Sequence, residues 1–405
     1  GTAHSYYSTE GSSQCIRAML FLALQGAPQN GERPVLLAAR NAHKALLYAA
    51  ALLDFDIRWL WPSAQAEGAL CSCPVTTEAL AGALHALAQQ GISPFGVYVT
   101  SPDYLGGVQE LPALAAVCRA QGVPLLVDNA HGAYLRFLPQ NCHPIAQGAA
   151  MCCDSAHKTL PVVTGGAYLH LAHDAPVQDE AAVRGALALF GSTSPSYLIL
   201  QSLDVCNAVL AGNYPRRLAQ CCAALEDLRR SLNKDAAARQ CPVPLVVAGA
   251  QQEPMKLTLD AAALGCTGTA LAEALRRAQL ECEYADPRYV VLMFTPENPP
   301  QDYTRLQTAL EQLLAAVPAG LPHPENRAGE FAALQQQAVQ RCTIRQAVLG
   351  AQVRVPVHKA LGRVCAMPTV SCPPAIPVVV SGEEITPAAI ALMQRYGIEE
   401  LSVLR

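Results

Sequence analysis

The sequence of 405 residues has few charged residues and no long hydrophobic run. Charged residues make up 15% of the chain, and 28 Lys and Arg stand against 32 Asp and Glu, which gives a net charge of −4 at pH 7. A chain without a basic excess has no general attraction for phosphate backbones, so we expect no nucleic-acid binding. The longest apolar run, at 45–53, is about half of what a bilayer crossing requires, so we expect no membrane span.

CxxC pairs are also missing, although the chain contains 16 cysteines. Zinc ribbons and thioredoxin-like sites use that spacing, so neither is expected, and we predict no metal site. Many cysteines in a small secreted protein indicate disulfides, but this chain is large. The cysteine pattern therefore favours buried, reduced thiols in a cytoplasmic protein. No signal peptide is visible, but the sequence begins at Gly1 without a methionine, which is compatible with a removed upstream segment.

In the first half of the chain, short continuous apolar runs alternate with helical patterns. Continuous apolar strands that alternate with helices indicate a mainly parallel sheet that is covered on both faces. Ligands gather at the carboxyl ends of such strands, where Asp128 and Asp154 lie. The predicted strands are 34–39, 95–100, 123–128, 149–154 and 166–171, and the predicted helices are 43–53, 76–90 and 111–121.

The second half predicts a smaller α/β unit and a separate C-terminal segment. The last segment follows a proline-rich joint at 318–326, and its helix begins at Pro387 after the cap Thr386 and ends at Gly397. The other elements predicted here are a long helix at 197–233, strands at 244–250, 255–260 and 288–295, and helices at 269–279 and 303–316. We therefore predict an α/β protein with domains at 1–240, 241–320 and 321–405.

Four short motifs carry polar side chains that suit one cofactor. GSSQ (11–14) precedes a helical pattern that begins near Cys15, and the N-terminus of a helix can hold a phosphate group. RNAHK (40–44) and DNAH (128–131) each follow a predicted strand. DSAHK (154–158) also lies at a strand end and adds a lysine. Each motif by itself has an ordinary structural interpretation, such as a serine cap or a structural histidine. Pyridoxal phosphate (PLP) needs a lysine amine, an acid beside its ring nitrogen, phosphate donors at a helix start and a flat group over its ring, and the four motifs together supply them.

Seven segments resemble the PLP-dependent ornithine/lysine/arginine decarboxylases, which have fold type I and belong to the aspartate aminotransferase superfamily. DSAHKTLPVVTGGAYLH (154–170) is similar to the segment that carries their cofactor lysine. The resemblance implies a seven-stranded type of large-domain sheet, a small α/β domain and a C-terminal α+β domain. The other matching segments are YYSTEGSSQ (6–14), RNAHKALL (40–47), VDNAHGAYLRF (127–137), STSPSYLILQSLD (192–204), EPMKLTLD (253–260) and CPPAIPVVVSGEEIT (372–386).

The resemblance implies a role for each matched residue. Lys158 would bond covalently to the cofactor, and Asp128 would pair with the ring nitrogen. His43 would stack on one face of the ring, Ala130 would pack against the other, and His131 would line the ring near its hydroxyl. The residues implied at the phosphate are Ser12, Ser13, Ser155 and His157, with Ser192 and Thr193 reaching the phosphate of a neighbouring subunit. The catalytic residues would be Lys158, Asp128, His157 and His43, and either Lys158 or His157 would return a proton to Cα.

The function implied by the resemblance is PLP-dependent decarboxylation of a basic amino acid in polyamine metabolism, by a homodimer with shared active sites. Arginine is slightly favoured over lysine and ornithine, because the short chain resembles the compact arginine-decarboxylase type. Glu10 and Glu283 are conceivable partners for the distal cation of the substrate, although a solvated surface charge is the more ordinary interpretation of each.

Two other functions stay open. An aminotransferase or aldolase of fold type I would use the same lysine and aspartate. A non-catalytic relative that binds PLP or a partner is the other alternative, because the family's N-terminal segment ahead of the phosphate loop has no counterpart in the printed sequence. In the C-terminal motif, Cys372 and Ala375 stand where the family has tyrosine and glycine. Ala375 would matter if that backbone requires a positive φ.

Overall fold

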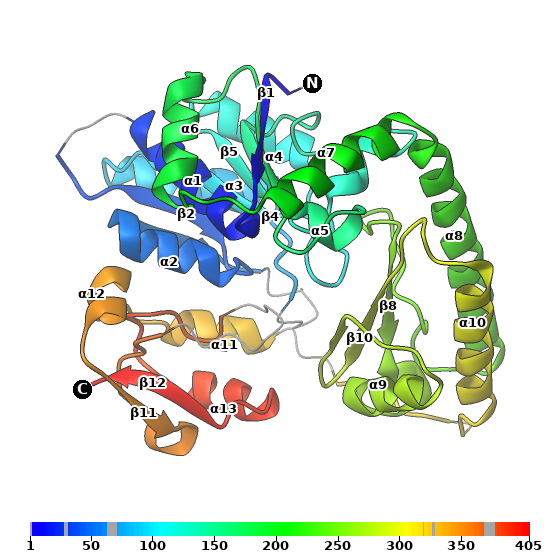
Figure 1. Cartoon of the computed structure of the whole chain (residues 1–405). Coiled ribbons are helices and arrows are strands. Elements are labelled where there is room, and N and C mark those ends of the chain that lie inside the picture. The colour runs from blue at the N-terminus through cyan, green and yellow to red at the C-terminus, as the bar shows by residue number, and fades with distance from the viewer. Residues whose placement is uncertain (1, 28–30, 63–70, 319, 326–328, 368–376) are drawn as a thin grey trace.

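The computed structural model describes residues 2–27, 31–62, 71–318, 320–325, 329–367 and 377–405 (Figure 1). Its largest sheet has seven strands in the order β1-β7-β6-β5-β4-β2-β3. The strands from β2 to β6 pair in parallel, whereas β7 runs antiparallel to both β6 and β1, so the prediction of a mainly parallel sheet is confirmed. The strands are β1 (His4–Ser8), β2 (Val35–Ala39), β3 (Asp56–Leu60), β4 (Val97–Thr100), β5 (Leu125–Asp128), β6 (Met151–Asp154) and β7 (Ala167–Leu171).

Helices cover both faces of this sheet, because successive strand residues are apolar on both sides. In β2, Leu36 and Ala38 pack in the core with α1 and α2, whereas Leu37 and Ala39 pack in the core with α3 and α4. The helices of this part are α1 (Gly11–Gln25), α2 (Lys44–Leu53), α3 (Thr77–Gln89), α4 (Leu111–Ala120), η1 (Ala133–Phe137), α5 (Ala156–Thr159), α6 (Glu180–Leu189) and α7 (Tyr197–Ala211).

A second, three-stranded antiparallel sheet has the order β8-β10-β9. The helices α8 and α10 run side by side along it, and α8 also leads away from the large sheet (Figure 1). Its elements are α8 (Tyr214–Ala238), β8 (Lys256–Asp260), η2 (Ala261–Leu264), α9 (Gly268–Arg277), β9 (Tyr284–Ala285), β10 (Tyr289–Met293) and α10 (Pro300–Ala315).

Two predictions in this region were wrong. The pattern at 197–233 forms two helices, because Pro215 in the first turn of α8 has no N–H with which to continue α7. The strand predicted at 244–250 is not formed, and a single bridge joins Val246 to Leu259. Instead, the side chain of Asn233 on α8 bonds both the N–H and the carbonyl of Val246, at 2.7 and 2.8 Å. An amide side chain here replaces a neighbouring strand.

The C-terminal segment combines a two-stranded antiparallel sheet with short helices and packs against α2. Its final helix is capped as predicted, since Thr386 accepts a hydrogen bond from the N–H of Ala389. Cys372 and Ala375 lie outside the described residues. Among the described residues, no helix combines the length and the hydrophobicity that a bilayer span requires. The elements are α11 (Gly329–Gln337), α12 (Ile344–Leu349), β11 (Gln352–Pro356), η3 (Val357–Lys359), α13 (Pro387–Arg395) and β12 (Glu400–Leu404).

Candidate active site

A small cavity lies at the carboxyl edge of the large sheet. Asn41 just after β2, Thr100 at the end of β4 and Asp128 at the end of β5 meet there, because parallel strands present their carboxyl ends at one edge. The residues that line it are Ser12, Asn41, His43, Cys71, Thr100, Tyr104, Asp128, Ala130, His131 and Lys158. Six of the residues predicted from the sequence therefore face one space, although they come from four separate motifs.

Lys158 lies on α5, a single turn of helix between β6 and β7. Its Nζ is 3.1 Å from Nε2 of His131. Burial lowers the pKa of Lys158, and the charges of Asp128 and Glu283 oppose that effect. Burial and the neighbouring charges of Lys256 and Lys158 hold the pKa of His131 well below its usual value. Burial thus favours the neutral, nucleophilic form of the amine, beside an imidazole whose neutral form is also favoured.

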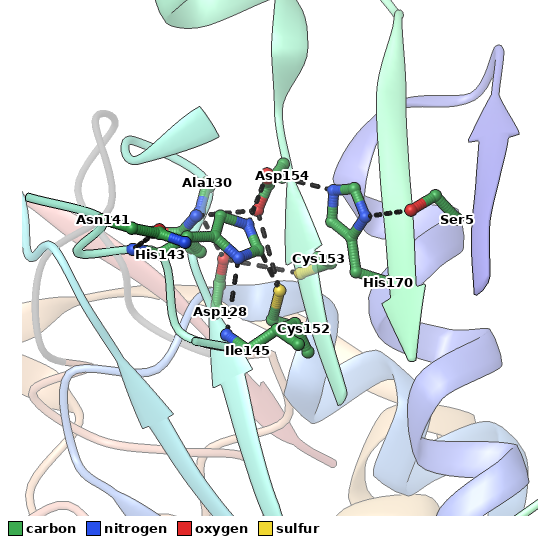
Figure 2. Close-up of polar contacts among 11 residues, drawn as sticks. Ser5, Asp128, Ala130, Asn141, His143, Ile145, Cys152, Cys153, Asp154 and His170 are labelled. Carbon is green, nitrogen blue, oxygen red and sulfur yellow. Dashed lines mark hydrogen bonds and ion pairs between the residues drawn. The ribbon is translucent and has the colours of Figure 1, made fainter. Parts of the chain in front are cut away.

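Asp128 is held in one orientation by donors on both carboxylate oxygens. The hydroxyl of Tyr98 donates to Oδ2 at 3.0 Å, and the backbone N–H of Ala130 donates to Oδ1 at 3.1 Å. The thiol of Cys153 lies 3.7 Å from Oδ1, and Figure 2 shows it beside Asp128 with Ala130. Burial raises the pKa of Tyr98 far above its usual value, so the phenol remains a donor. A fixed, buried carboxylate of this kind suits a protonated ring nitrogen.

His43 caps the N-terminus of α2, and its Nδ1 accepts a hydrogen bond from the N–H of Ala45 at 3.1 Å. Burial lowers the pKa of His43, while the charge of Asp128 opposes the shift. The result is a neutral imidazole whose ring is fixed by the helix that follows it. His43 is one of the residues that line the cavity.

The phosphate side of the site differs from the prediction in one respect. The helix α1 begins at Gly11 rather than near Cys15, so Ser12 and Ser13 lie in its first turn. The hydroxyl of Ser155 donates to that of Ser12 at 2.8 Å, and the N–H of Gly11 donates to the carbonyl of Gly165, also at 2.8 Å. These two bonds join the start of α1 to Ser155 and Gly165, which lie on either side of Lys158 in the sequence. The N–H groups at the start of α1 and the nearby hydroxyls suit the binding of an anion.

Not every residue predicted from the sequence faces the cavity in this chain. Nδ1 of His157 donates to the carbonyl of Gly166 at 2.9 Å, and His157 is not among the residues that line the cavity. Ser192 and Thr193 lie between α6 and α7 and are exposed to solvent. Their predicted role involves a neighbouring subunit, and a single chain does not test it.

Asp154 ends the other strand selected from the sequence, and it lies in a buried hydrogen-bonded network with two histidines (Figure 2). Its Oδ2 is 3.1 Å from Nε2 of His143 and 3.2 Å from Nε2 of His170, and Oδ1 accepts from the amide of Asn129 at 2.7 Å. Burial raises the pKa of Asp154, but the two histidines outweigh it and hold that pKa below its usual range.

This network also includes Cys152, whose thiol lies 3.7 Å from His143, so the group contains residue types that bind metals. However, the second ring nitrogen of each histidine also has a protein partner, Ile145 N–H for His143 and the Ser5 hydroxyl for His170. Hydrogen bonding therefore accounts for the group. The hydrogen bond from Asn129 to Asp154 connects this network to the residue that directly follows Asp128.

Several cavity residues were missed by the sequence analysis. Thr100 ends a predicted strand and could have been found by the same rule that selected Asp128. Tyr98 lies two residues earlier on the same strand, but only the fold shows that its hydroxyl reaches Asp128. Asn41 lies inside the RNAHK motif but was not singled out there. Tyr104 and Cys71 come from loops without a recognisable motif, so their approach depends on the packing of distant segments.

The donor set matches the chemical requirements of PLP. It provides an amine, a carboxylate with two fixed donors, a flat imidazole and a pair of hydroxyls at a helix start. In addition, Nδ1 of His131 and the side-chain oxygen of Asn41 line the cavity and are buried without a hydrogen-bond partner among the described residues. Polar atoms of this kind are usually satisfied by a ligand or by water.

Comparison with known proteins gives a match over most of the chain. The family model described as Orn/Lys/Arg decarboxylase, major domain, matches residues 1–301, and the model of its C-terminal domain matches residues 326–396. An arginine decarboxylase of Bacillus subtilis (strain 168) is 27% identical over 394 residues, which cover 95% of this chain and 76% of the relative. The constitutive lysine decarboxylase of Escherichia coli (strain K12) is 26% identical over 233 residues, or 54% of this chain and 30% of the relative. The crystal structure of the lysine decarboxylase LdcF of Francisella novicida superposes with a TM-score of 0.76 at 17% identity, covering 100% of this chain and 70% of that one, and it shows a shared fold.

Proposed function

This chain belongs to the Orn/Lys/Arg decarboxylase family, and from that premise we propose that it catalyses the PLP-dependent decarboxylation of a basic amino acid. The observation that carries the proposal is that Lys158, Asp128 and His43 line one cavity at the carboxyl edge of the large sheet. Arginine is the favoured substrate, since several relatives that match nearly the whole chain are named arginine decarboxylase.

PLP, when bound, supplies a protonated ring that accepts the electron pair left on the substrate's Cα as CO2 departs. Lys158 would hold its aldehyde carbon, and the carboxylate of Asp128 would keep a proton on the ring nitrogen. Tyr98 and Ala130 hold that carboxylate in place. The imidazole of His43 would cover one face of the ring and exclude water from it. The start of α1, with Ser12, would hold the phosphate.

We propose Lys158 rather than His157 as the group that returns a proton to the substrate's Cα. Nδ1 of His157 is engaged with the carbonyl of Gly166, whereas Nζ of Lys158 projects into the cavity beside His131. A lysine amine of lowered pKa exchanges protons near neutral pH more readily than an unperturbed one does. His131 would orient that amine.

A homodimer with shared active sites is part of the proposal. The segment that carries Ser192 and Thr193 is exposed, and the large apolar side chains of Leu189, Tyr197 and Leu198 are 61%, 82% and 73% exposed beside it. Exposed apolar residues that cluster in this way mark interaction surfaces. A second copy that covers them would bring the hydroxyls of Ser192 and Thr193 to the partner's cavity.

We also propose a cytoplasmic location and a role in polyamine metabolism. The buried cysteines Cys15, Cys71, Cys73 and Cys118 form no disulfide, as expected in a reducing compartment. Decarboxylation of arginine, lysine or ornithine gives a diamine or a guanidino amine, which is the starting material of polyamines. The domain division at 1–240, 241–320 and 321–405 follows the family pattern and is likewise proposed.

The deciding experiment is a substrate panel. The protein is saturated with PLP and given arginine, lysine or ornithine, and released CO2 and the amine product are measured beside keto-acid formation. We expect CO2 and amine in equal amounts from at least one substrate, with arginine the fastest. Keto acid in place of CO2 would identify another fold-type-I enzyme. Stable PLP binding without turnover of any of the three would identify a non-catalytic relative.

A further inference from the structure

Glu283 lies beside the cavity and is held by one of the residues that line it. The hydroxyl of Tyr104 donates to the Glu283 carboxylate at 2.8 Å. Tyr104 follows β4 of the large sheet and lines the cavity, whereas Glu283 lies just before β9 of the small sheet. The two side chains therefore join the two sheets at the edge of the site.

This carboxylate is one aromatic ring away from the amine of Lys158. The ring centre of Tyr104 is 6.0 Å from Nζ of Lys158, and the Glu283 carboxylate bonds the hydroxyl of that same ring. The negative charge of Glu283 is close enough to favour the protonated form of Lys158. An extended arginine or lysine side chain spans roughly 6–7 Å from Cα to its distal nitrogen. A basic substrate bound beside Lys158 would thus extend its second cation past the ring of Tyr104 and toward Glu283.

Two other carboxylates of this region accept hydrogen bonds within the protein. Asp103 accepts from the N–H of Gly107, and Oε2 of Glu253 accepts from the hydroxyl of Tyr134 and the N–H of Met255, whereas Oε1 of Glu253 has no hydrogen-bond partner among the described residues. Both are buried and lie close to the ammonium of Lys256. Glu283 is instead exposed, so its carboxylate oxygens can accept further hydrogen bonds from a ligand.

We propose that Glu283 recognises the distal ammonium or guanidinium of the substrate, and that Tyr104 positions its carboxylate. This inference rests on the proposed function and names the residue that selects a basic side chain. A guanidinium matches a carboxylate with two parallel hydrogen bonds, whereas an ammonium binds as a point charge. The site would therefore accept both cations and favour the guanidinium. Glu10, the other carboxylate considered, precedes α1 and lies on the phosphate side.

The test compares two amines, of which only one carries a distal cation. Dissociation constants of agmatine, which keeps the guanidinium, and of n-pentylamine, which lacks a second charge, are measured by calorimetry on the PLP-loaded protein. We expect Glu283→Gln to weaken agmatine binding about 10- to 100-fold, the range for a charged hydrogen bond, and to leave n-pentylamine binding unchanged. Tyr104→Phe keeps the ring and should weaken agmatine binding less, about 3- to 10-fold.

Glu281→Gln is the matched control, because Glu281 lies two residues away, is exposed and pairs with Arg276 instead. It should bind both amines as the unmodified protein does. If the unmodified protein prefers agmatine and Glu283→Gln keeps that preference, the assignment of Glu283 is wrong while the proposed function stands. A protein that neither prefers agmatine nor decarboxylates any basic amino acid would refute the proposed function itself. If Glu283→Gln does not fold, the assignment is judged by Tyr104→Phe, and unchanged discrimination by that variant overturns it.

Discussion

Arg40 and Glu383 form a fully buried ion pair between the large sheet and the C-terminal segment. Both guanidinium Nη atoms lie 2.8 Å from the two carboxylate oxygens, and the guanidinium also lies over the rings of Trp59 and Trp61. Arg40 directly follows β2 and precedes His43 by three residues. The C-terminal segment therefore supports the turn that carries the imidazole of the site.

Glu383→Gln is expected to lower the free energy of unfolding by about 3 kcal/mol or more, because a buried guanidinium loses its counter-charge. Glu384→Gln is the matched control. Glu384 pairs with Arg341, whose side chain is 55% exposed, so its loss should cost less than about 1 kcal/mol. Urea unfolding of the two variants measures the difference. Equal losses would show that the buried pair contributes no more than the exposed one.

Lys158→Ala is expected to abolish turnover and the visible absorbance of covalently bound PLP, since Lys158 contributes the amine that lines the cavity. Lys234→Ala removes an exposed lysine of α8 and should leave both properties unchanged. Spectra and CO2 release are recorded after PLP addition and desalting. Retention of absorbance and turnover in Lys158→Ala would contradict the cofactor assignment.

Asp128→Asn is expected to reduce kcat about 10²- to 10³-fold, because a neutral amide cannot hold the ring nitrogen protonated. Tyr98→Phe should reduce it about 10-fold, since one of the two fixed donors to the carboxylate is lost. Tyr303→Phe removes a hydroxyl that bonds the thiol of Cys221, away from the site, and should have no effect on kcat. If Tyr98→Phe behaves like Tyr303→Phe, the orientation of Asp128 does not depend on the phenol.

Glu253 gives the protein a pH-dependent stability. Burial raises the pKa of Glu253 to about 7, although the charge of Lys256 opposes the shift. In the unfolded chain a glutamate has a pKa of about 4.3, so the folded state binds the proton more tightly. The stabilisation is complete below about pH 4 and is lost as the pH rises toward 7.

Glu253→Gln should therefore flatten the dependence of stability on pH between about 4.5 and 7, by an amount on the order of 1–3 kcal/mol. Part of the dependence should persist, because burial also raises the pKa of Asp103 to about 6. Urea midpoints at several pH values measure the slope. Glu311→Gln, an exposed position on α10, is the control and should keep the slope of the unmodified protein.

Local sequence patterns predicted most elements of the fold, because they depend on interactions between near neighbours. Continuous apolar runs predicted β2, β5 and β6, and the cap at Thr386 predicted the start of α13. The failures have long-range causes. The strand predicted at 244–250 is reduced to a single bridge to β8, and Val246 also bonds the side chain of Asn233 on a preceding helix, a contact that is not visible in the strand's own residues.

The site shows the same division between local and long-range information. Lys158, Asp128 and His43 could be selected because each follows a recognisable strand. Tyr104 and Glu283 could not be placed, because their contact joins residues 179 positions apart in two different sheets. The role of Ser192 and Thr193 depends on a second chain, which no pattern within one chain describes.

The helix α2 is held at both of its ends. His43 caps its start at the cavity, and at its other end Arg345 of the C-terminal segment donates to the carbonyls of Ala51 and Leu52, at 2.9 and 3.1 Å. No described residue of 329–405 lines the cavity. Yet Arg345, which bonds the end of α2, and Glu383, which pairs with Arg40, both belong to that stretch. A fragment cut off before residue 329 would keep every wall of the pocket and still lose the brace that aligns its imidazole. The C-terminal segment thus stabilises the position of the His43 side chain without contributing to the lining of the cavity.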